Sequence, residues 1–479
     1  MKNPKNRAVN GVVWSAIERF SVQAIQFLVS IILARLLTPT DFGIVAIVLI
    51  FSTIFQTINE AGFNTALVHK QNRDNLDYST AFVANILIGV VSYLILFFVA
   101  PYISEFYDIP ELTNIMRLLS LNLIINSFSL VPIAIFTIRI DFKTQARASL
   151  VSAILSGICG IIIAYNAKNA YAIVAQQISF SLCYTFLLII FSHYKISLKF
   201  STQRFKFLFG YASKLIGARV ISVIFDDIYS LAIGKLYAPN VLGCYNRAQS
   251  FQQILSKNII NIVQRVSVPI LCEAQNDIEL MKKVLIKFLT NTALVVYPIL
   301  ALLMVLSQPI VLIVLGDKWI EVSSILKYVC PIGFFYLIST FNRNIYNATG
   351  RTDLAFKTEI IKKCLFVLVF IITMNHSIRV LLIGLIAISI IEMIIDVAMV
   401  TRQIGLTLIT ELKSLMGIIC STALMSTLIH FLTYSFDDHY IQISIGATSG
   451  IILYLTTCYL FNISNFRTEI KNYVNKNHR

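Results

Sequence analysis

The chain has 479 residues, of which 57% are hydrophobic and 13% charged, and its formal net charge is +15. Soluble domains are about 45–50% apolar and about 25% charged. The apolar residues here fall in runs of roughly twenty, long enough to cross about 30 Å of hydrocarbon as a helix. These quantities exclude a soluble enzyme and a collagen-like or disordered chain, and they argue against a nucleic-acid partner. They predict an all-α membrane protein.

The hydropathy pattern predicts about fourteen transmembrane helices joined by short connections. The predicted spans lie near residues 11–36, 42–66, 79–103, 114–137, 148–166, 170–192, 207–236, 241–268, 288–315, 328–348, 358–374, 380–401, 415–434 and 441–463. The longest connection, 269–287, is too short for a soluble catalytic domain. The basic N-terminal segment leads into the first apolar run without a small-residue cleavage site, so we expect a retained span and not a signal peptide.

The basic residues between these spans predict the orientation. If the N-terminus is cytoplasmic, the inner segments hold 26 Lys and Arg and the outer segments hold six. Cytoplasmic loops collect Lys and Arg in this way. The bias predicts that both termini are cytoplasmic, and it accounts for most of the net charge.

An internal repeat relates the two halves of the chain. The segment Arg35-Leu-Leu-Thr-Pro-Thr-Asp-Phe-Gly43 matches Lys235-Leu-Tyr-Ala-Pro-Asn-Val-Leu-Gly243 at an offset of 200 residues. Six spans precede a basic linker and six follow it, so both halves enter the membrane the same way round, which predicts a parallel repeat. We therefore expect a six-helix lobe over 1–192, a cytoplasmic linker over 193–206, a second six-helix lobe over 207–401, and two extra helices with a basic cytoplasmic tail over 402–479.

Two predicted spans carry a stripe of polar residues along one face, at about 100° per residue. The stripe of the first span consists of Ser15, Arg19, Gln23, Gln26 and Ser30, and that of the seventh of Arg219, Ser222, Asp226 and Ser230. A guanidinium at membrane depth costs about 2.5–3.5 kcal/mol on insertion scales, so it should face water, a partner charge or the bundle interior. The two stripes predict a cationic cavity between the lobes, and Arg is suited to phosphate because its planar fork donates two hydrogen bonds. The alternative is that Arg19 pairs with Glu18, and Arg219 with Asp226 or Asp227, only to neutralise buried charge.

The eighth span is too polar to face lipid, so we expect it to line an aqueous path. Its polar residues are Asn246, Arg247, Gln249, Gln252, Gln253, Lys257, Asn258, Asn261 and Gln264. We add Arg247, Gln252 and Lys257 to the predicted substrate-binding set.

Four carboxylates within predicted spans are candidates for a coupling ion. Asp226 and Asp227 lie in the middle of the seventh span, and Glu392 and Asp396 share one face of the twelfth. Intramembrane carboxylates can carry H⁺ or Na⁺. The alternative is that they form ion pairs with arginines or lysines of the lobes.

Other residue types give no sign of metal or cofactor chemistry. The eight cysteines are scattered without a Cys-x-x-Cys pair, and the six histidines have no metal-ligand spacing. No nucleotide-binding Gly-rich loop, nucleophile elbow or His-Glu-x-x-His occurs. We expect no metal, no cofactor and no ATP hydrolysis. Trp14 and Trp319 are expected at membrane interfaces or facing lipid.

Three stretches resemble a known family, the Wzx-type polysaccharide exporters of the multidrug/oligosaccharidyl-lipid/polysaccharide flippase superfamily, in particular its colanic-acid and teichuronic-acid exporter branch. They are Leu36-Leu-Thr-Pro-Thr-Asp-Phe-Gly-Ile-Val-Ala46 with Asn59-Glu-Ala-Gly-Phe-Asn-Thr-Ala-Leu-Val68; Leu242-Gly-Cys-Tyr-Asn-Arg-Ala-Gln249 with Val268-Pro-Ile-Leu-Cys-Glu-Ala-Gln-Asn-Asp277; and Asn347-Ala-Thr-Gly-Arg-Thr-Asp353. The family often has a proline within the eighth span, whereas this chain reads Gln253-Ile-Leu-Ser-Lys257. That departure bears on whether the helix breaks there.

The resemblance implies a transporter and not an enzyme. It implies that two lobes rock by alternating access and flip an oligosaccharide linked to undecaprenyl diphosphate, such as an O-antigen, capsule or exopolysaccharide unit. The movement would run from the inner to the outer leaflet of the bacterial cytoplasmic membrane. The implied partners are this substrate, membrane lipid, H⁺ or Na⁺ as coupling ion, and a polysaccharide polymerase as a further candidate.

Three other functions stay open at this point. A drug or cation antiporter of the same superfamily should have a cavity richer in carboxylates than in arginines. A membrane glycosyltransferase, polymerase or ligase usually needs a sizeable outer loop, and every predicted outer loop is short. A scaffold without transport gives no reason for buried charge.

Overall fold

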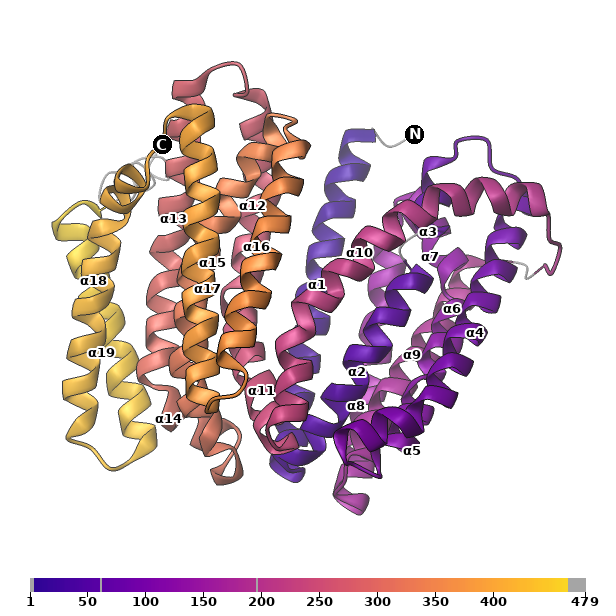
Figure 1. The fold of residues 1–479 in the computed structure, drawn as a ribbon, viewed down its shortest axis with the longest axis horizontal. Coiled ribbons are helices and arrows are strands. Elements are labelled where there is room, and N and C mark those ends of the chain that lie inside the picture. The colour runs from indigo at the N-terminus through magenta and orange to yellow at the C-terminus, as the bar shows by residue number, and fades with distance from the viewer. Residues whose placement is uncertain (1–3, 61–62, 195–196, 464–479) are drawn as a thin grey trace. The chain divides into compact units, whose positions relative to one another are not determined.

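The computed structural model describes residues 4–60, 63–194 and 197–463, and the regular elements in this part of the chain are all helices (Figure 1). The chain divides into two compact units, Met1–Gly243 and Cys244–Arg479. The first unit holds α1 (Pro4–Leu36), α2 (Pro39–Glu60), α3 (Phe63–His69), α4 (Asn75–Tyr107), α5 (Leu112–Leu119), α6 (Leu121–Ser127), α7 (Leu130–Arg139), α8 (Phe142–Ala167), α9 (Tyr171–Ser192) and α10 (Thr202–Leu236), with the start of α11 (Pro239–Leu255).

The second unit holds the rest of α11 and all later helices. These are α12 (Lys257–Glu273), α13 (Ile278–Val305), α14 (Ser307–Val314), the 3-10 turn η1 (Asp317–Trp319), α15 (Ile320–Ala348), α16 (Thr352–Thr373), α17 (Ile378–Ile404), α18 (Leu408–Tyr434) and α19 (His439–Leu460). Each of the fourteen predicted spans falls on one of these helices or on a run of consecutive helices.

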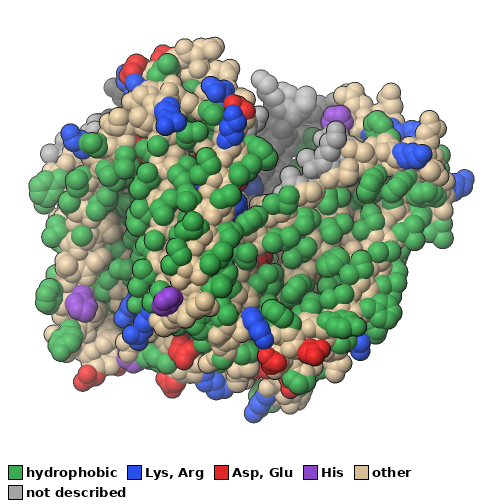
Figure 2. All heavy atoms as spheres, viewed as in Figure 1, with side chains coloured by type: hydrophobic (Ala, Val, Ile, Leu, Met, Phe, Trp, Pro, Cys, Tyr) green, Lys and Arg blue, Asp and Glu red, His purple; other side chains and the backbone are tan. Residues whose placement is uncertain are grey.

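Fewer helices than fourteen are apolar enough to be assigned as spans by composition. Among the described residues, nine helices are long and apolar enough to cross a membrane, or ten if the bent pair Leu112–Ser127 and Leu130–Arg139 is one span. Figure 2 shows hydrophobic side chains over the middle of the visible face, with many of the charged side chains gathered toward its upper and lower ends. The chain is therefore a multi-pass membrane protein, and the number fourteen stays a prediction.

Helix α10 packs within the first unit, against α2, α3 and α4. At its start, Arg204 forms ion pairs with Asp74 (3.1 Å) and with the fully buried Asp77 (3.3 Å), which also pairs with Lys70 (2.6 Å). At its end, Lys235 pairs with Asp108 over 3.0 Å. These contacts hold α10 on α4 at both ends.

Leu208 of α10 belongs to the core of the first unit, which extends to Gly243. The sequence repeat assigns α10 to the lobe over 207–401. The two predicted six-helix lobes and the linker over 193–206 stay predictions.

The two repeat motifs contact each other within the first unit. A Cβ added at Gly43 would lie 1.8 Å from the carbonyl oxygen of Pro239, and one added at Gly243 would lie 2.0 Å from that of Pro39. The starts of α2 and α11 therefore cross backbone to backbone. Glycine is required at both positions because only a hydrogen leaves room for the opposing carbonyl.

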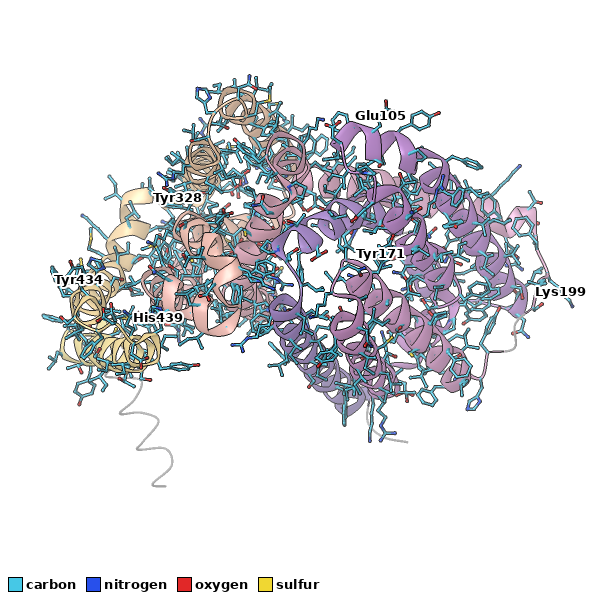
Figure 3. The ribbon with its side chains drawn as sticks, turned by 90° about the horizontal axis from the view of Figure 1, so that it is seen from below. Glu105, Tyr171, Lys199, Tyr328, Tyr434 and His439 are labelled. Carbon is cyan, nitrogen blue, oxygen red and sulfur yellow. The ribbon has the colours of Figure 1, made fainter. Side chains whose placement is uncertain are left out.

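The core of the second unit lies between α12, α13, α15, α17 and α18, with Leu285, Leu337, Phe341 and Val397 almost completely buried. Helices α18 and α19 pack on each other, on α13 and on α14. In Figure 3, Tyr434 and His439 lie at the turn that joins α18 to α19. Tyr454 of α19 donates its hydroxyl to the backbone oxygen of Leu294 over 2.8 Å. The two C-terminal helices are thus packed parts of this unit.

Candidate functional site

The polar stripe of the seventh predicted span lies on α10, and its charged residues are exposed. Arg219, Ser222 and Asp226 are exposed, Asp227 is half-buried and Ser230 is buried. Residues spaced by three and four share one helix face. An exposed guanidinium and carboxylate on an otherwise apolar chain cannot face lipid without a large free-energy cost. This face of α10 is the strongest candidate in the first unit for a surface that contacts water or a polar ligand.

The stripe of the first predicted span is described only from Phe20 onward. Gln23 and Ser30 are half-buried and Gln26 is exposed. Ser30 donates its hydroxyl to the backbone oxygen of Phe27 over 2.7 Å. The side chains of Ser15 and Arg19 lie outside the described residues, so the predicted role of Arg19 stays a prediction.

Arg247 and Trp319 lie together in the second unit. The guanidinium carbon of Arg247 is 5.9 Å from the centroid of the Trp319 ring. This geometry is within the range of a cation–π interaction. Trp319 has no exposed surface, so it does not face lipid, and its expected place at a membrane interface stays a prediction.

The eighth predicted span is broken at Ser256 into α11 and α12, even though the chain has no proline there. Ser256 donates to the backbone oxygen of Gln252 over 2.8 Å and accepts from its Nε2 over 2.9 Å. Gln252 itself is buried against Gly333 of α15, where a Cβ would lie 2.5 Å from Nε2. Lys257 begins α12 and is exposed. Of the three residues of this span in the predicted substrate-binding set, Gln252 is therefore packed between helices, whereas the side chain of Lys257 is exposed.

Asp396 is part of a buried ion pair. Its carboxylate lies 2.5 Å from Nζ of Lys362 on α16, and the two side chains are 0% and 3% exposed. Ser339 of α15 donates to the same carboxylate, and Tyr346 donates to the backbone oxygen of Asp396 over 2.9 Å. For Asp396, the structure shows the alternative that we left open, ion pairing with a lysine of the same lobe. Glu392 is half-buried one turn before it.

Sequence reasoning missed the polar residues of α15 that organise this unit. Ser339 contacts Asp396, Asn342 donates to Glu411 of α18 over 3.0 Å, and Asn344 accepts from Gln264 of α12 over 3.0 Å. The signal was the run Ser339-Thr-Phe-Asn-Arg-Asn344 inside an apolar span. Within the described residues, no group of three or more His, Cys, Asp or Glu is arranged to hold a metal ion.

In the part of the chain that the structure describes, the regular elements are all helices and at least nine of them are candidate spans, which defines a multi-pass α-helical membrane protein. The chain belongs to the family described as "Polysaccharide biosynthesis protein", whose profile matches residues 32–324. The resemblance seen in the sequence is thus confirmed at the level of the family.

Individual relatives agree with this family. The chain is 22% identical to the lipopolysaccharide biosynthesis protein WzxC of Escherichia coli (strain K12), over 76% of this chain and 74% of that protein. It is 24% identical to the teichuronic acid biosynthesis protein TuaB of Bacillus subtilis (strain 168), over 74% of each chain. It is 25% identical to the succinoglycan biosynthesis transport protein ExoT of Rhizobium meliloti (strain 1021), over 64% of this chain and 62% of that protein.

Solved structures share the fold. The lipid II flippase MurJ superposes with a TM-score of 0.73 at 17% identity, over 94% of this chain and 99% of that chain. An inward-facing multidrug resistance transporter of the MATE family superposes with a TM-score of 0.63 at 12% identity, over 81% of this chain and 98% of that chain. At these identities the likeness establishes the fold alone.

Proposed function

We propose that this protein flips an oligosaccharide linked to undecaprenyl diphosphate from the inner to the outer leaflet of the bacterial cytoplasmic membrane, and that it is not an enzyme. Family membership supports the substrate class. The observation that carries the proposal is the exposed face of α10, where Arg219 and Ser222 can donate hydrogen bonds to an anion. Arg19 of α1 would provide the second guanidinium, as the sequence repeat predicts.

The chemistry of flipping requires no bond to break. The protein must lower the barrier to moving a hydrated diphosphate through the bilayer, and charge-assisted contacts of about 1.5–3 kcal/mol each would do so. An inside-negative potential adds about 2.3 kcal/mol per charge per 100 mV for outward movement of the anion. The empty transporter then returns with a counter-ion, and Asp226 is our first candidate to carry it because it is exposed on the same face of α10.

The experiment is the replacement of Arg219 and Arg19 by alanine, one at a time. Binding of undecaprenyl diphosphate to the purified protein should weaken about 10- to 150-fold, the equivalent of one charge-assisted contact. Surface polysaccharide should be lost in a strain that depends on this protein. Arg402→Ala is the matched control, because Arg402 is an exposed arginine at the end of α17.

Equal membrane abundance of all variants is required for the comparison. Normal polysaccharide and unchanged binding in both arginine variants would refute the assignment of this face. A gain in drug sensitivity with normal polysaccharide would instead favour a drug or cation antiporter.

A further inference from the structure

Glu411 is a carboxylic acid residue without any exposed surface, in the first turn of α18. It faces Asn342 of α15, which is also 0% exposed. The Nδ2 group of Asn342 donates to Glu411 Oε2 over 3.0 Å and to the backbone oxygen of Ile338 over 3.0 Å. Both amide hydrogens of Asn342 are therefore in use.

Among the described residues, two oxygen atoms of this pair have no hydrogen-bond donor. They are Glu411 Oε1 and Asn342 Oδ1, and both are buried. An ionised carboxylate and an amide carbonyl can only accept hydrogen bonds, so neither can satisfy the other. Because buried acceptors are normally satisfied and a buried charge is normally paired, this site lacks one positively charged or donating species.

Protein cations do not supply that species in the part of the chain that the structure describes. On α13, Tyr297 interacts with Glu411, and its hydroxyl donates to the backbone oxygen of Phe334 over 3.3 Å. Nζ of Lys282 lies 3.9 Å from the position of a Cβ added at Gly405, and Lys282 pairs with Glu279 over 2.7 Å. Among the described residues of α15, α17 and α19, no ionised side chain interacts with Glu411. Asp396 differs in this respect, because Lys362 neutralises it.

We propose that Glu411 and Asn342 form an exchangeable proton-binding site. A proton on Glu411 Oε1 turns that oxygen into the donor that Asn342 Oδ1 lacks, and the neutral acid and the amide then form two parallel hydrogen bonds. Release of the proton to water leaves a carboxylate and one hydrogen bond, which loosens α18 from α15. Thr407, Ile409 and Thr410 are exposed, so the site lies one helical turn from the surface and a proton has a short route to it.

Infrared spectroscopy of the purified protein in lipid tests the site directly. At neutral pH we expect the C=O band of a protonated carboxyl group that disappears at alkaline pH and is missing in Glu411→Gln. The glutamine variant should fold, since its amide can form both hydrogen bonds of the protonated pair. Asn342→Leu should shift the band by removing the hydrogen-bond partner. Glu279→Gln is the control and should leave the band unchanged, because Glu279 is exposed and paired with a lysine.

A protonated-carboxyl spectrum of Glu411→Gln identical to that of the wild type would overturn the proposal. So would a Glu411 carboxylate band that is present at neutral pH and responds to Na⁺ in otherwise sodium-free buffer, since the missing species would then be a metal cation.

A role of this proton in transport rests on the proposed function and is tested separately. In sealed vesicles, addition of lipid-linked oligosaccharide should move protons in the wild type and not in Glu411→Gln. Substrate translocation in the wild type without proton movement would overturn the role in transport and leave the proposed function intact. A wild type that translocates no substrate would refute the proposed function, while the infrared band would still decide whether the site exists.

Discussion

The crossing of α2 and α11 makes a specific prediction about Gly43→Ala. The added methyl group would lie 1.8 Å from the carbonyl oxygen of Pro239 and 3.2 Å from the backbone nitrogen of Gly243. Both obstacles are backbone atoms, so no side-chain rotation relieves the overlap and the helices must separate.

The magnitude follows from two opposing terms. An overpacked methyl group costs about 1–3 kcal/mol, and alanine in a helix gains about 1 kcal/mol over glycine. Because the contact is with rigid backbone, we expect the upper end of the first range and a net destabilisation of about 2 kcal/mol. Gly210→Ala is the matched control on α10, where an added Cβ meets nothing within 4 Å. That variant should be stabilised by up to about 1 kcal/mol.

The assay is reversible denaturant unfolding in detergent micelles, with thermal unfolding as a second probe. A double-mutant cycle sharpens it. Gly243→Ala meets Pro39 at 2.0 Å across the same crossing, so the double variant should be less destabilised than the sum of the two singles, because one separation of the helices relieves both. Equal stabilities of Gly43→Ala and Gly210→Ala, or strict additivity in the cycle, would refute the reasoning.

Three further predictions concern charged and polar pairs. Asp396→Asn should lower the free energy of unfolding in a denaturant titration by about 3–5 kcal/mol, because Lys362 is left charged and buried. Adding Lys362→Met to that variant should restore much of the lost stability. A double variant whose destabilisation equals the sum of the two single effects would contradict this. The backbone N–H of Asp77 donates to the carboxylate of Asp74 and holds the pKa of Asp74 below its usual value of 3.8. The stability that Asp74 contributes relative to Asp74→Ala is therefore complete above pH 3.8 and is lost as the pH falls through the lowered pKa. In thermal unfolding at several acidic pH values, the melting temperatures of the wild type and Asp74→Ala should converge. A difference in melting temperature that stays constant with pH would exclude this contribution. Tyr107→Phe should cost about 1 kcal/mol, because its hydroxyl donates to Leu231 across α4 and α10 over 3.2 Å; an unchanged melting temperature would show that the contact contributes nothing.

Much of the protein's class can be predicted from sequence because the relevant physics is local. Apolar runs long enough to cross hydrocarbon, and the scarcity of charge, require helices in a membrane whatever their packing. The motif that ends in Gly43 and recurs at Gly243 is visible in the sequence, and the structure shows why glycine stands in both places. The polar face of α10 follows from helical periodicity alone, and Arg219 and Asp226 are exposed on it.

What tertiary structure decided is the partner of each buried polar group. Asp396 was a candidate to carry a coupling ion because it lies in an apolar run of the sequence. Only the packing of α16 against α17 brings Lys362 next to it. Glu411 was not a candidate in the sequence, yet it is a buried carboxyl group for which packing provides no cation among the described residues. The reason is that periodicity assigns a side chain to a face of its own helix, whereas solvation and pairing depend on which other helix covers that face.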